Sequence, residues 1–169
     1  RDVIMTEQAP GRSGVTNLER EGEIAADFLE KLLDIADLDG DIDVEVEGGR
    51  AAVSIVDSEE GQVPRSLVGS GGKTLDALQE LMRLAVQAET GERSRAMLDI
   101  AGHRAERRSA LESKAADAVA EAKKTGAKVE MEPMTAFERK VVHDVVLAAG
   151  LTSESEGAEP NRYVVVLPE

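Results

Sequence analysis

The apolar residues near the start of the chain recur at helical spacing. The stripe comprises Leu18, Ile24, Ala25, Phe28, Leu29, Leu32 and Leu33. Because residues three or four positions apart share one face of a helix, this spacing predicts an amphipathic helix that ends near Ala36, before a turn. Residues 1–16 contain proline and glycine and show no periodicity, so they are predicted to form a flexible tail.

A strict alternation of apolar and acidic residues follows over residues 41–47. Period-2 alternation is typical of a strand with one face in water. Gly48-Gly49 is a two-residue hairpin signal, and residues 51–56 supply the return strand. The sequence therefore predicts a β-hairpin directly after the first helix.

A glycine-rich stretch, Gly69-Ser70-Gly71-Gly72-Lys73, lies between the hairpin and the next helical pattern. Pro64 to Val68 is predicted to form one helical turn before it, since proline suits the first position of a helix. Thr74 is the expected N-cap of the helix after it. The apolar face of that helix comprises Leu75, Leu78, Leu81, Met82, Ala85 and Val86. Alternation over Arg95 to Ala101 then predicts a third strand.

The remaining pattern predicts a long Ala-rich helix and a second small unit. The helix runs from His103 to Lys124 and is closed by Gly126. A short strand over 128–131 precedes a helix whose capping box is Thr135 with Glu138, and that helix ends near Ala149. The final strand lies within residues 161–167, with room for one more strand before it. The fold class is therefore α+β, with two small domains joined by a long helix.

The composition of the 169 residues excludes several function classes. The chain has no cysteine, which rules out disulfides, thiolate catalysis and Cys-ligated zinc and fits a reducing cytoplasm. Aromatic residues make up only 2%, so stacking of bases on several rings is not expected. No apolar run approaches the length of a membrane span, so no membrane insertion is expected.

The net charge of −14 is concentrated in the N-terminal third of the chain. Residues 1–60 carry 17 acids and 5 bases, a net of −12, whereas residues 61–127 carry 9 acids and 11 bases, a net of +2. A uniformly acidic protein would repel nucleic acid, but this chain keeps a locally basic centre.

Two motif fragments fail on spacing. Gly72-Lys73-Thr74 has the ending of a phosphate-binding P-loop, but that motif requires glycine where Leu67 stands. The acidic run at 37–41 has the start of a calcium loop, but its sixth and twelfth positions are Ile42 and Gly48. The two histidines share no metal spacing, and no nucleophile and base form a defensible pair. We therefore expect no enzyme, no catalytic residue, no metal and no cofactor.

The glycine stretch and its surroundings resemble a KH domain. The resemblance rests on the order α-β-β-α-α-β over residues 17–102 and on a Gly-x-x-Gly loop at Gly69 to Gly72. Such a loop lets backbone N–H groups approach phosphates and clamps about four nucleotides of a single strand. The RNA-binding residues that the resemblance implies are Val68, Gly69, Ser70, Gly71, Gly72 and Lys73.

The segment after the linking helix of residues 103–126 resembles an RxxxH ("R-three-H") domain, a β-α-β-β unit over residues 127–169. Arg139 and His143 lie four positions apart, so on a helix they would project together. The nucleic-acid-binding residues that this resemblance implies are Arg139, Lys140, His143 and Arg162.

A KH unit followed by an RxxxH unit is similar to the Jag family, also called SpoIIIJ-associated proteins. The resemblance implies a bacterial, cytoplasmic regulator that binds single-stranded RNA, or single-stranded DNA, and acts post-transcriptionally in cell elongation, division or sporulation. It also implies an alternative, a protein-interaction module that assembles with a second small KH-domain protein. The variable pair Ser70-Gly71 contains no basic residue, so weak and salt-sensitive RNA binding is expected.

The accessory basic residues and the two motifs also have simpler explanations. Arg65, Arg104, Arg107 and Arg108 could add RNA contacts, but the last three could equally form a solubilising helix face. The glycine loop could be a flexible connection without a ligand. Arg139 and His143 could belong to an exposed, salt-bridged surface with Glu138 or Asp144.

Overall fold

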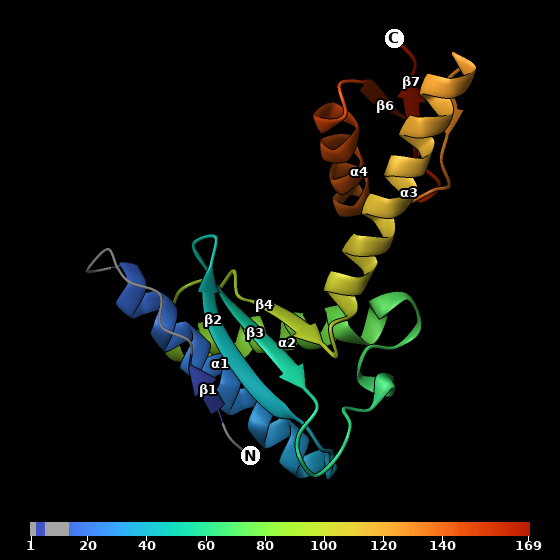
Figure 1. The fold of residues 1–169 in the computed structure, drawn as a ribbon. Coiled ribbons are helices and arrows are strands. Elements are labelled where there is room, and N and C mark those ends of the chain that lie inside the picture. The colour runs from blue at the N-terminus through green and yellow to red at the C-terminus, as the bar shows by residue number, and fades with distance from the viewer. Residues whose placement is uncertain (1–2, 6–13) are drawn as a thin grey trace. The chain divides into compact units, whose positions relative to one another are not determined.

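The computed structural model in Figure 1 describes residues 3–5 and 14–169. The chain divides into two compact units, Arg1–Arg104 and Ala105–Glu169. Each unit has its own cluster of buried apolar side chains. The structure is therefore mixed α and β, as the fold class predicts.

The first unit contains a four-stranded sheet in the order β1-β2-β3-β4. The predicted hairpin is present as β2 (Asp41–Glu47) and β3 (Arg50–Val56), which pair antiparallel. The third predicted strand is β4 (Met97–Ile100), shorter than expected and parallel to β3. The alternation of the sequence is visible in the burial of Ile42 and Val44, whose neighbours on β2 are more exposed.

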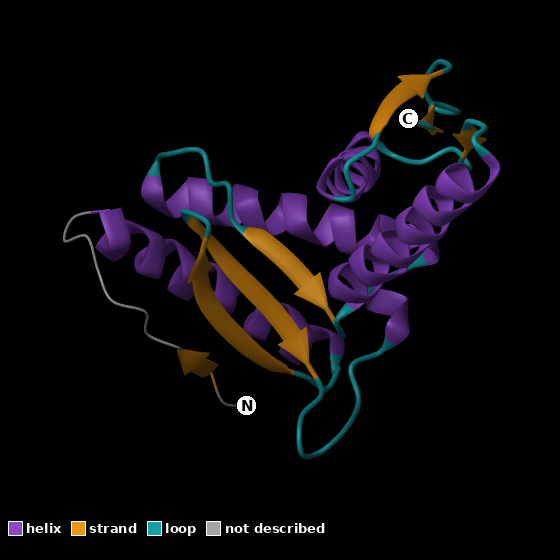
Figure 2. Cartoon of the chain, turned by 45° about the horizontal axis from the view of Figure 1, so that its top comes forward, coloured by secondary structure: helices purple, strands orange, loops and turns teal. Residues whose placement is uncertain are grey.

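Two helices cover one face of this sheet, as Figures 1 and 2 show. They are α1 (Gly14–Ala36) and α2 (Lys73–Thr90), which also pack against each other. Most members of the predicted apolar stripes supply the core, with Leu29, Leu33, Leu75 and Met82 fully buried. Leu81 is an exception: it was predicted on the apolar face of the second helix, but it is 51% exposed, so that prediction is wrong. The Pro64–Val68 turn is present as η1 (Arg65–Leu67), and the glycine stretch forms a second turn, η2 (Ser70–Gly72).

The second unit combines two helices with a three-stranded sheet in the order β5-β7-β6. The predicted long helix is α3 (His103–Thr125), and it contributes buried side chains such as Leu111 and Val119 to the second core. β5 (Val129–Glu130), α4 (Ala136–Ala148), β6 (Thr152–Glu156) and β7 (Tyr163–Leu167) follow. This matches the predicted β-α-β-β order, and the capping box of Thr135 and Glu138 is confirmed.

Two predictions about local structure were wrong. Part of the predicted tail is ordered, because Val3–Met5 forms β1 parallel to β2 and α1 already begins at Gly14. The other predicted tail residues, 1–2 and 6–13, lie outside the described residues. Thr74 is not the N-cap of α2, since Gly72 occupies that position in a left-handed conformation.

Within residues 3–5 and 14–169, no helix is both long and apolar enough to cross a membrane. The same residues contain no group of three or more His, Cys, Asp and Glu side chains arranged to hold a metal ion.

Candidate nucleic-acid interface

The glycine loop is folded on itself at one end and open to solvent at the other. Gly69, with φ 73° and ψ 178°, has a conformation that essentially only glycine adopts. Gly71, with φ 63° and ψ 19°, lies near the left-handed region that side chains other than Asn and Asp rarely adopt. A Cβ at Gly69 would collide with the side chain of Thr74, so the loop closes tightly on the first turn of α2. A Cβ at Gly71 would meet nothing within 4 Å. Gly71 is therefore where a ligand can approach the backbone.

Backbone hydrogen bonds inside the loop occupy some of its amides and leave two others available to a ligand. The N–H of Gly69 donates to the carbonyl of Arg65 at 3.2 Å, and that of Gly72 donates to Gly69 at 3.3 Å. The next amide, of Lys73, donates to Ser70. Of the four amides in Gly69–Gly72, those of Ser70 and Gly71 remain as candidates for a phosphate contact.

Val68 supports the loop from the core side. It is only 5% exposed, and its carbonyl accepts the N–H of Leu75 at 3.0 Å. A side chain this deeply buried holds the loop against α2, and its apolar surface contributes mostly to packing.

Two exposed cations flank the loop. Arg65 begins η1, and Lys73 is the first residue of α2. Neither forms an ion pair with a residue in the described part of the chain. Both charges are therefore open to an anionic ligand beside the loop.

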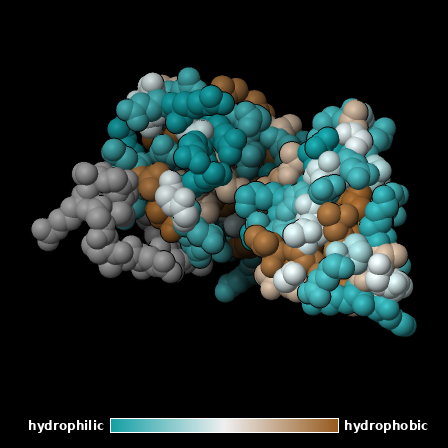
Figure 3. Space-filling model, turned by 90° about the horizontal axis from the view of Figure 1, so that it is seen from above, coloured by the Kyte–Doolittle hydropathy of each residue, from teal (hydrophilic) through white to brown (hydrophobic). Residues whose placement is uncertain are grey.

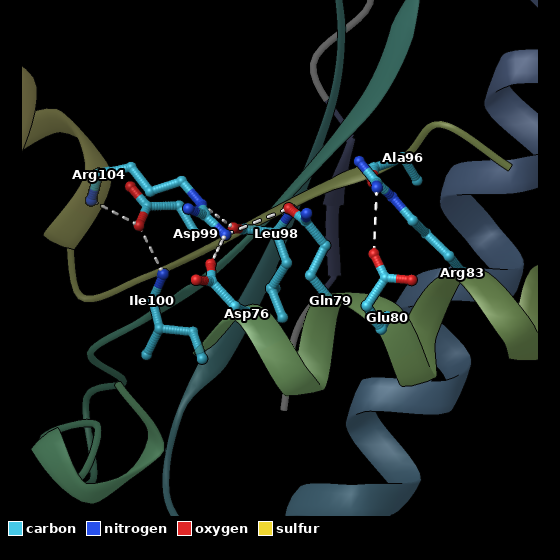
Figure 4. A network of polar contacts seen from close by, with 9 residues as sticks. All are labelled: Asp76, Gln79, Glu80, Arg83, Ala96, Leu98, Asp99, Ile100 and Arg104. Atoms are coloured by element: carbon cyan, nitrogen blue, oxygen red, sulfur yellow. Dashed lines mark hydrogen bonds and ion pairs between the residues drawn. The ribbon is translucent and has the colours of Figure 1, made fainter. Parts of the chain in front are cut away.

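The side chain of Arg104, in contrast, forms hydrogen bonds within the first unit. Figure 4 shows its guanidinium between β4 and α2, donating to the Leu98 carbonyl at 2.8 Å and to Asp76 Oδ1 at 3.0 Å. A longer contact of 3.3 Å reaches Gln79. The side chain anchors the start of α3 to the first unit, so it is a poor candidate for RNA contact.

Arg107 and Arg108 are also paired. Arg107 donates to Glu138 Oε1 at 2.9 Å, and this hydrogen bond raises the pKa of the guanidinium. Burial alone would raise the pKa of Glu138, but the hydrogen bonds from Arg107 and Thr135 outweigh it and hold that pKa below its ordinary value. Arg108 pairs with Glu112 at 3.2 Å on the exposed face of α3. The salt-bridged helix face is thus the better description of these two residues.

In the second unit, Arg139 points inward instead of projecting into solvent. Its guanidinium donates to the Met134 carbonyl at 2.8 Å and to Glu159 Oε1 at 2.7 Å, and its side chain is only 10% exposed. The alternative of an exposed surface on which Arg139 pairs with Glu138 or Asp144 is therefore wrong for this residue, whose partner is Glu159. The side chain joins α4 to the segments on both sides of it in the sequence.

His143 lies against β6, where both ring nitrogens have hydroxyl partners. Nδ1 lies 2.6 Å from Ser153 Oγ, and Nε2 lies 2.8 Å from Ser155 Oγ. Burial lowers the pKa of His143, the Arg139 charge lowers it further, and Asp144 opposes both effects. Arg139 and His143 do share a face of α4, as predicted; on that face Arg139 is buried and His143 is partly exposed.

The other two candidates of this unit are more accessible. Lys140 is exposed and pairs with Asp144 at 3.0 Å, one turn along α4. Arg162 lies just before β7 and donates to the Gly157 carbonyl at 2.8 Å. Exposed contacts of this kind contribute little stability, so both cations can exchange partners at small cost.

Several partners in these sites were not identified from the sequence. Ser153 and Ser155 alternate along β6, so a period-2 argument would have placed both hydroxyls on one face of that strand. Glu159 and His103 offer no such signal, because they meet Arg139 and the glycine loop only through the tertiary fold.

Comparison with known proteins places the chain among nucleic-acid-binding relatives. The R-three-H domain family matches residues 108–168. An RNA-binding protein KhpB of Clostridium symbiosum is 31% identical over 143 residues, which are 84% of this chain and 64% of that protein. The KhpB protein of Lactiplantibacillus plantarum is 27% identical over 98% of this chain and 51% of its own length. The KhpB protein of Bacillus subtilis is also 27% identical, over 70% of this chain and 62% of its own length. The chain spans less than two thirds of the length of these relatives.

Proposed function

The chain belongs to the Jag family, which includes the KhpB proteins, and on that premise we propose that it is a non-enzymatic protein that binds single-stranded RNA. The first unit would act as a KH domain and the second, with its R-three-H match, as a further nucleic-acid contact. Relatives named RNA-binding proteins and the α-β-β-α-α-β order of residues 14–100 support this proposal.

The observation that carries the proposal is the open end of the glycine loop. Ser70 and Gly71 are exposed, their amides are not used by the hydrogen bonds that close the loop, and Arg65 and Lys73 stand beside them without ion-pair partners in the described chain. Backbone amides and flexible cations suit a phosphate, which carries no sequence information. This site would therefore hold the RNA backbone and leave base preference to other contacts.

The second contact surface would be formed by Lys140 and Arg162, with His143 beside them. Arg139 would act by holding Met134 and Glu159 in place, because its guanidinium is buried. Two modest sites on one chain raise the overall affinity when one RNA can reach both.

The biological role that we include in this proposal, on the strength of the family resemblance, is post-transcriptional regulation in the bacterial cytoplasm, in cell elongation and division or in sporulation. Single-stranded RNA is the form that such loops recognise. Single-stranded DNA, which offers the same phosphates, is a secondary ligand of the same surface.

A charge reversal at Gly71 tests the loop directly. Gly71→Asp places a carboxylate at the point of closest approach to phosphate, and we expect the affinity for a single-stranded RNA of about 12 nucleotides to fall about tenfold or more. Gly71→Asn is the matched control. It has nearly the same shape, and both side chains tolerate the left-handed conformation of this residue.

Fluorescence anisotropy would measure both variants, with thermal unfolding to confirm that each is folded. Equal affinities of Gly71→Asp and the wild type would contradict an RNA contact at the loop. An equal loss in Gly71→Asp and Gly71→Asn would show that the backbone, and not the charge, matters.

One surface favours the alternative, assembly with a second small KH-domain protein. Helix α2 buries Leu75, Leu78, Met82 and Val86, yet Leu81 and Leu84 on its other side are 51% and 59% exposed. Ala77 and Ala88 continue this stripe at spacings of four residues, which suit packing against a partner helix. The surface in Figure 3 is mostly hydrophilic and is interrupted by hydrophobic patches. The stripe Ala77–Leu81–Leu84–Ala88 would be the docking face of this alternative.

A further inference from the structure

The first residue of α3, His103, contacts the glycine loop. Its Nε2 atom lies 3.1 Å, and its Cδ2 atom 3.6 Å, from the position that a Cβ on Gly72 would occupy. One edge of the imidazole therefore faces the last glycine of the loop, the residue that caps the N-terminus of α2. A Cβ at position 72 would require the ring to shift by a few tenths of an ångström.

A strained turn brings His103 to the loop. Ala101 has a φ of 52°, one of two such non-glycine residues in the described chain, and Gly102 follows with a φ of 69°. The N–H of Ala101 donates to the Ile55 carbonyl at 2.9 Å, which ties the turn to β3. Strain of this kind persists only where neighbouring structure holds it, and it is concentrated at functional sites.

The residue after His103 fixes the first turn of α3 (Figure 4). The backbone N–H of Arg104 donates to Asp99 Oδ1 at 2.9 Å, while its guanidinium binds Asp76 on α2 and the Leu98 carbonyl on β4. With Ala101 and Arg104 anchored on either side, the backbone of His103 has little freedom to move away from the loop.

The imidazole itself is free for a ligand. It is partly exposed, and no hydrogen bond or ion pair joins it to any residue of the described chain. Arg65 and Gly102 line the same cavity, so the turn before His103 adjoins one of the free cations at the loop. An imidazole can donate from Nε2 in its neutral Nε2–H tautomer or as imidazolium.

We propose that His103 is an additional RNA-binding residue whose Nε2–H donates a hydrogen bond to the phosphate held by the Ser70 and Gly71 amides. This inference rests on the proposed function of the loop. It extends the site beyond the Gly-x-x-Gly segment to the start of α3, which the sequence pattern assigns to a linking helix.

Two substitutions test separately the Nε2–H donor of His103 and the space that its ring fills. His103→Phe keeps a flat ring beside Gly72 but removes the donor, and we expect about a tenfold loss of affinity for a single-stranded RNA of about 12 nucleotides. His103→Gln restores an N–H at a similar distance and should recover most of the binding. Thermal unfolding of each variant shows whether the fold is retained.

Nitrogen-15 NMR of the wild-type chain supplies a readout that does not depend on a variant. Addition of the RNA should shift the Nε2 resonance of His103, because a phosphate contact changes the electronic environment of that nitrogen. An unshifted Nε2 resonance at saturating RNA would overturn the proposal.

Gly71→Asp distinguishes failure of this inference from failure of the proposed function. If Gly71→Asp loses affinity while His103→Phe binds like the wild type, the loop binds RNA without His103. If the wild type does not bind, or Gly71→Asp has no effect, the RNA site at the loop and the role of His103 both fail.

Discussion

Some basic residues of this chain form ion pairs that stabilise the fold, and others have no ion-pair partner in the described chain. Arg104 pairs with Asp76, 28 positions away, and Arg139 with Glu159, 20 positions away. Such partners are decided by the tertiary fold, so a count of charges along the sequence cannot reveal them. Arg65 and Lys73 have no ion-pair partner in the described chain and carry the positive charge at the loop. The basic centre of the sequence is therefore a weaker guide to RNA contact than these two residues.

His143 makes the stability of the second unit depend on pH. Its pKa in the folded chain lies below the ordinary value of 6.5, chiefly because of burial. Between these two values the unfolded chain binds more protons than the folded one, so stability falls as the pH drops through this window. We expect the urea midpoint of the wild type to decrease on acidification from about pH 7.5 to pH 5.5.

His143→Gln is the matched control for this dependence. Glutamine can still bond to Ser153 and Ser155 but does not titrate. The variant should lose less stability over the same pH range, and the difference between the two curves isolates His143 from the carboxylates. Parallel curves for the wild type and the variant would contradict the prediction.

At the scale of helices and strands, local signals predicted most of the fold. The hairpin at Gly48-Gly49 and the cap at Thr135 are set by a few neighbouring residues, and both are confirmed. Strand β1 was missed because three residues carry no periodicity and pair in parallel with β2, far along the sequence. Thr74 was misassigned because its side chain packs over Gly69, leaving Gly72 as the cap of α2. β1, which is held by a strand distant in the sequence, is the element that the sequence pattern did not reveal.

The capping box of α4 gives a prediction at this scale. Thr135 Oγ1 accepts the N–H of Glu138 at 3.3 Å, and Glu138 Oε2 accepts the N–H of Thr135 at 3.0 Å. Thr135→Ala removes the first bond and should lower the free energy of unfolding by about 1 kcal/mol. Thr135→Ser keeps the hydroxyl and should stay near the wild type.

Amide hydrogen exchange would locate this effect within the molecule. Faster exchange is expected at Val142 and Val146, two of the buried residues of α4, in Thr135→Ala alone. Equal exchange in the alanine and serine variants would show that the cap does not stabilise the helix.

Over the whole molecule, a net charge of −14 opposes RNA binding while a small open site favours it. Four of the basic residues in the middle third, Arg83, Arg104, Arg107 and Arg108, are neutralised by acidic partners. The attraction must then come from a few contacts around the glycine loop and from Lys140 and Arg162. A site of this size implies modest affinity and a salt dependence set by a few phosphate contacts.

Salt dependence separates RNA binding from assembly through α2. Two to four phosphate contacts predict that the logarithm of the affinity falls with the logarithm of salt concentration with a slope of about −1.4 to −2.8. Leu81→Asp, on the exposed side of α2, should leave this slope unchanged, because Leu81 lies outside the phosphate site. An apolar interface responds little to salt in this range. The opposite result would be an RNA affinity that does not change with salt concentration and is lost in Leu81→Asp. That result would identify the α2 stripe as the principal binding surface and contradict the role assigned to the loop.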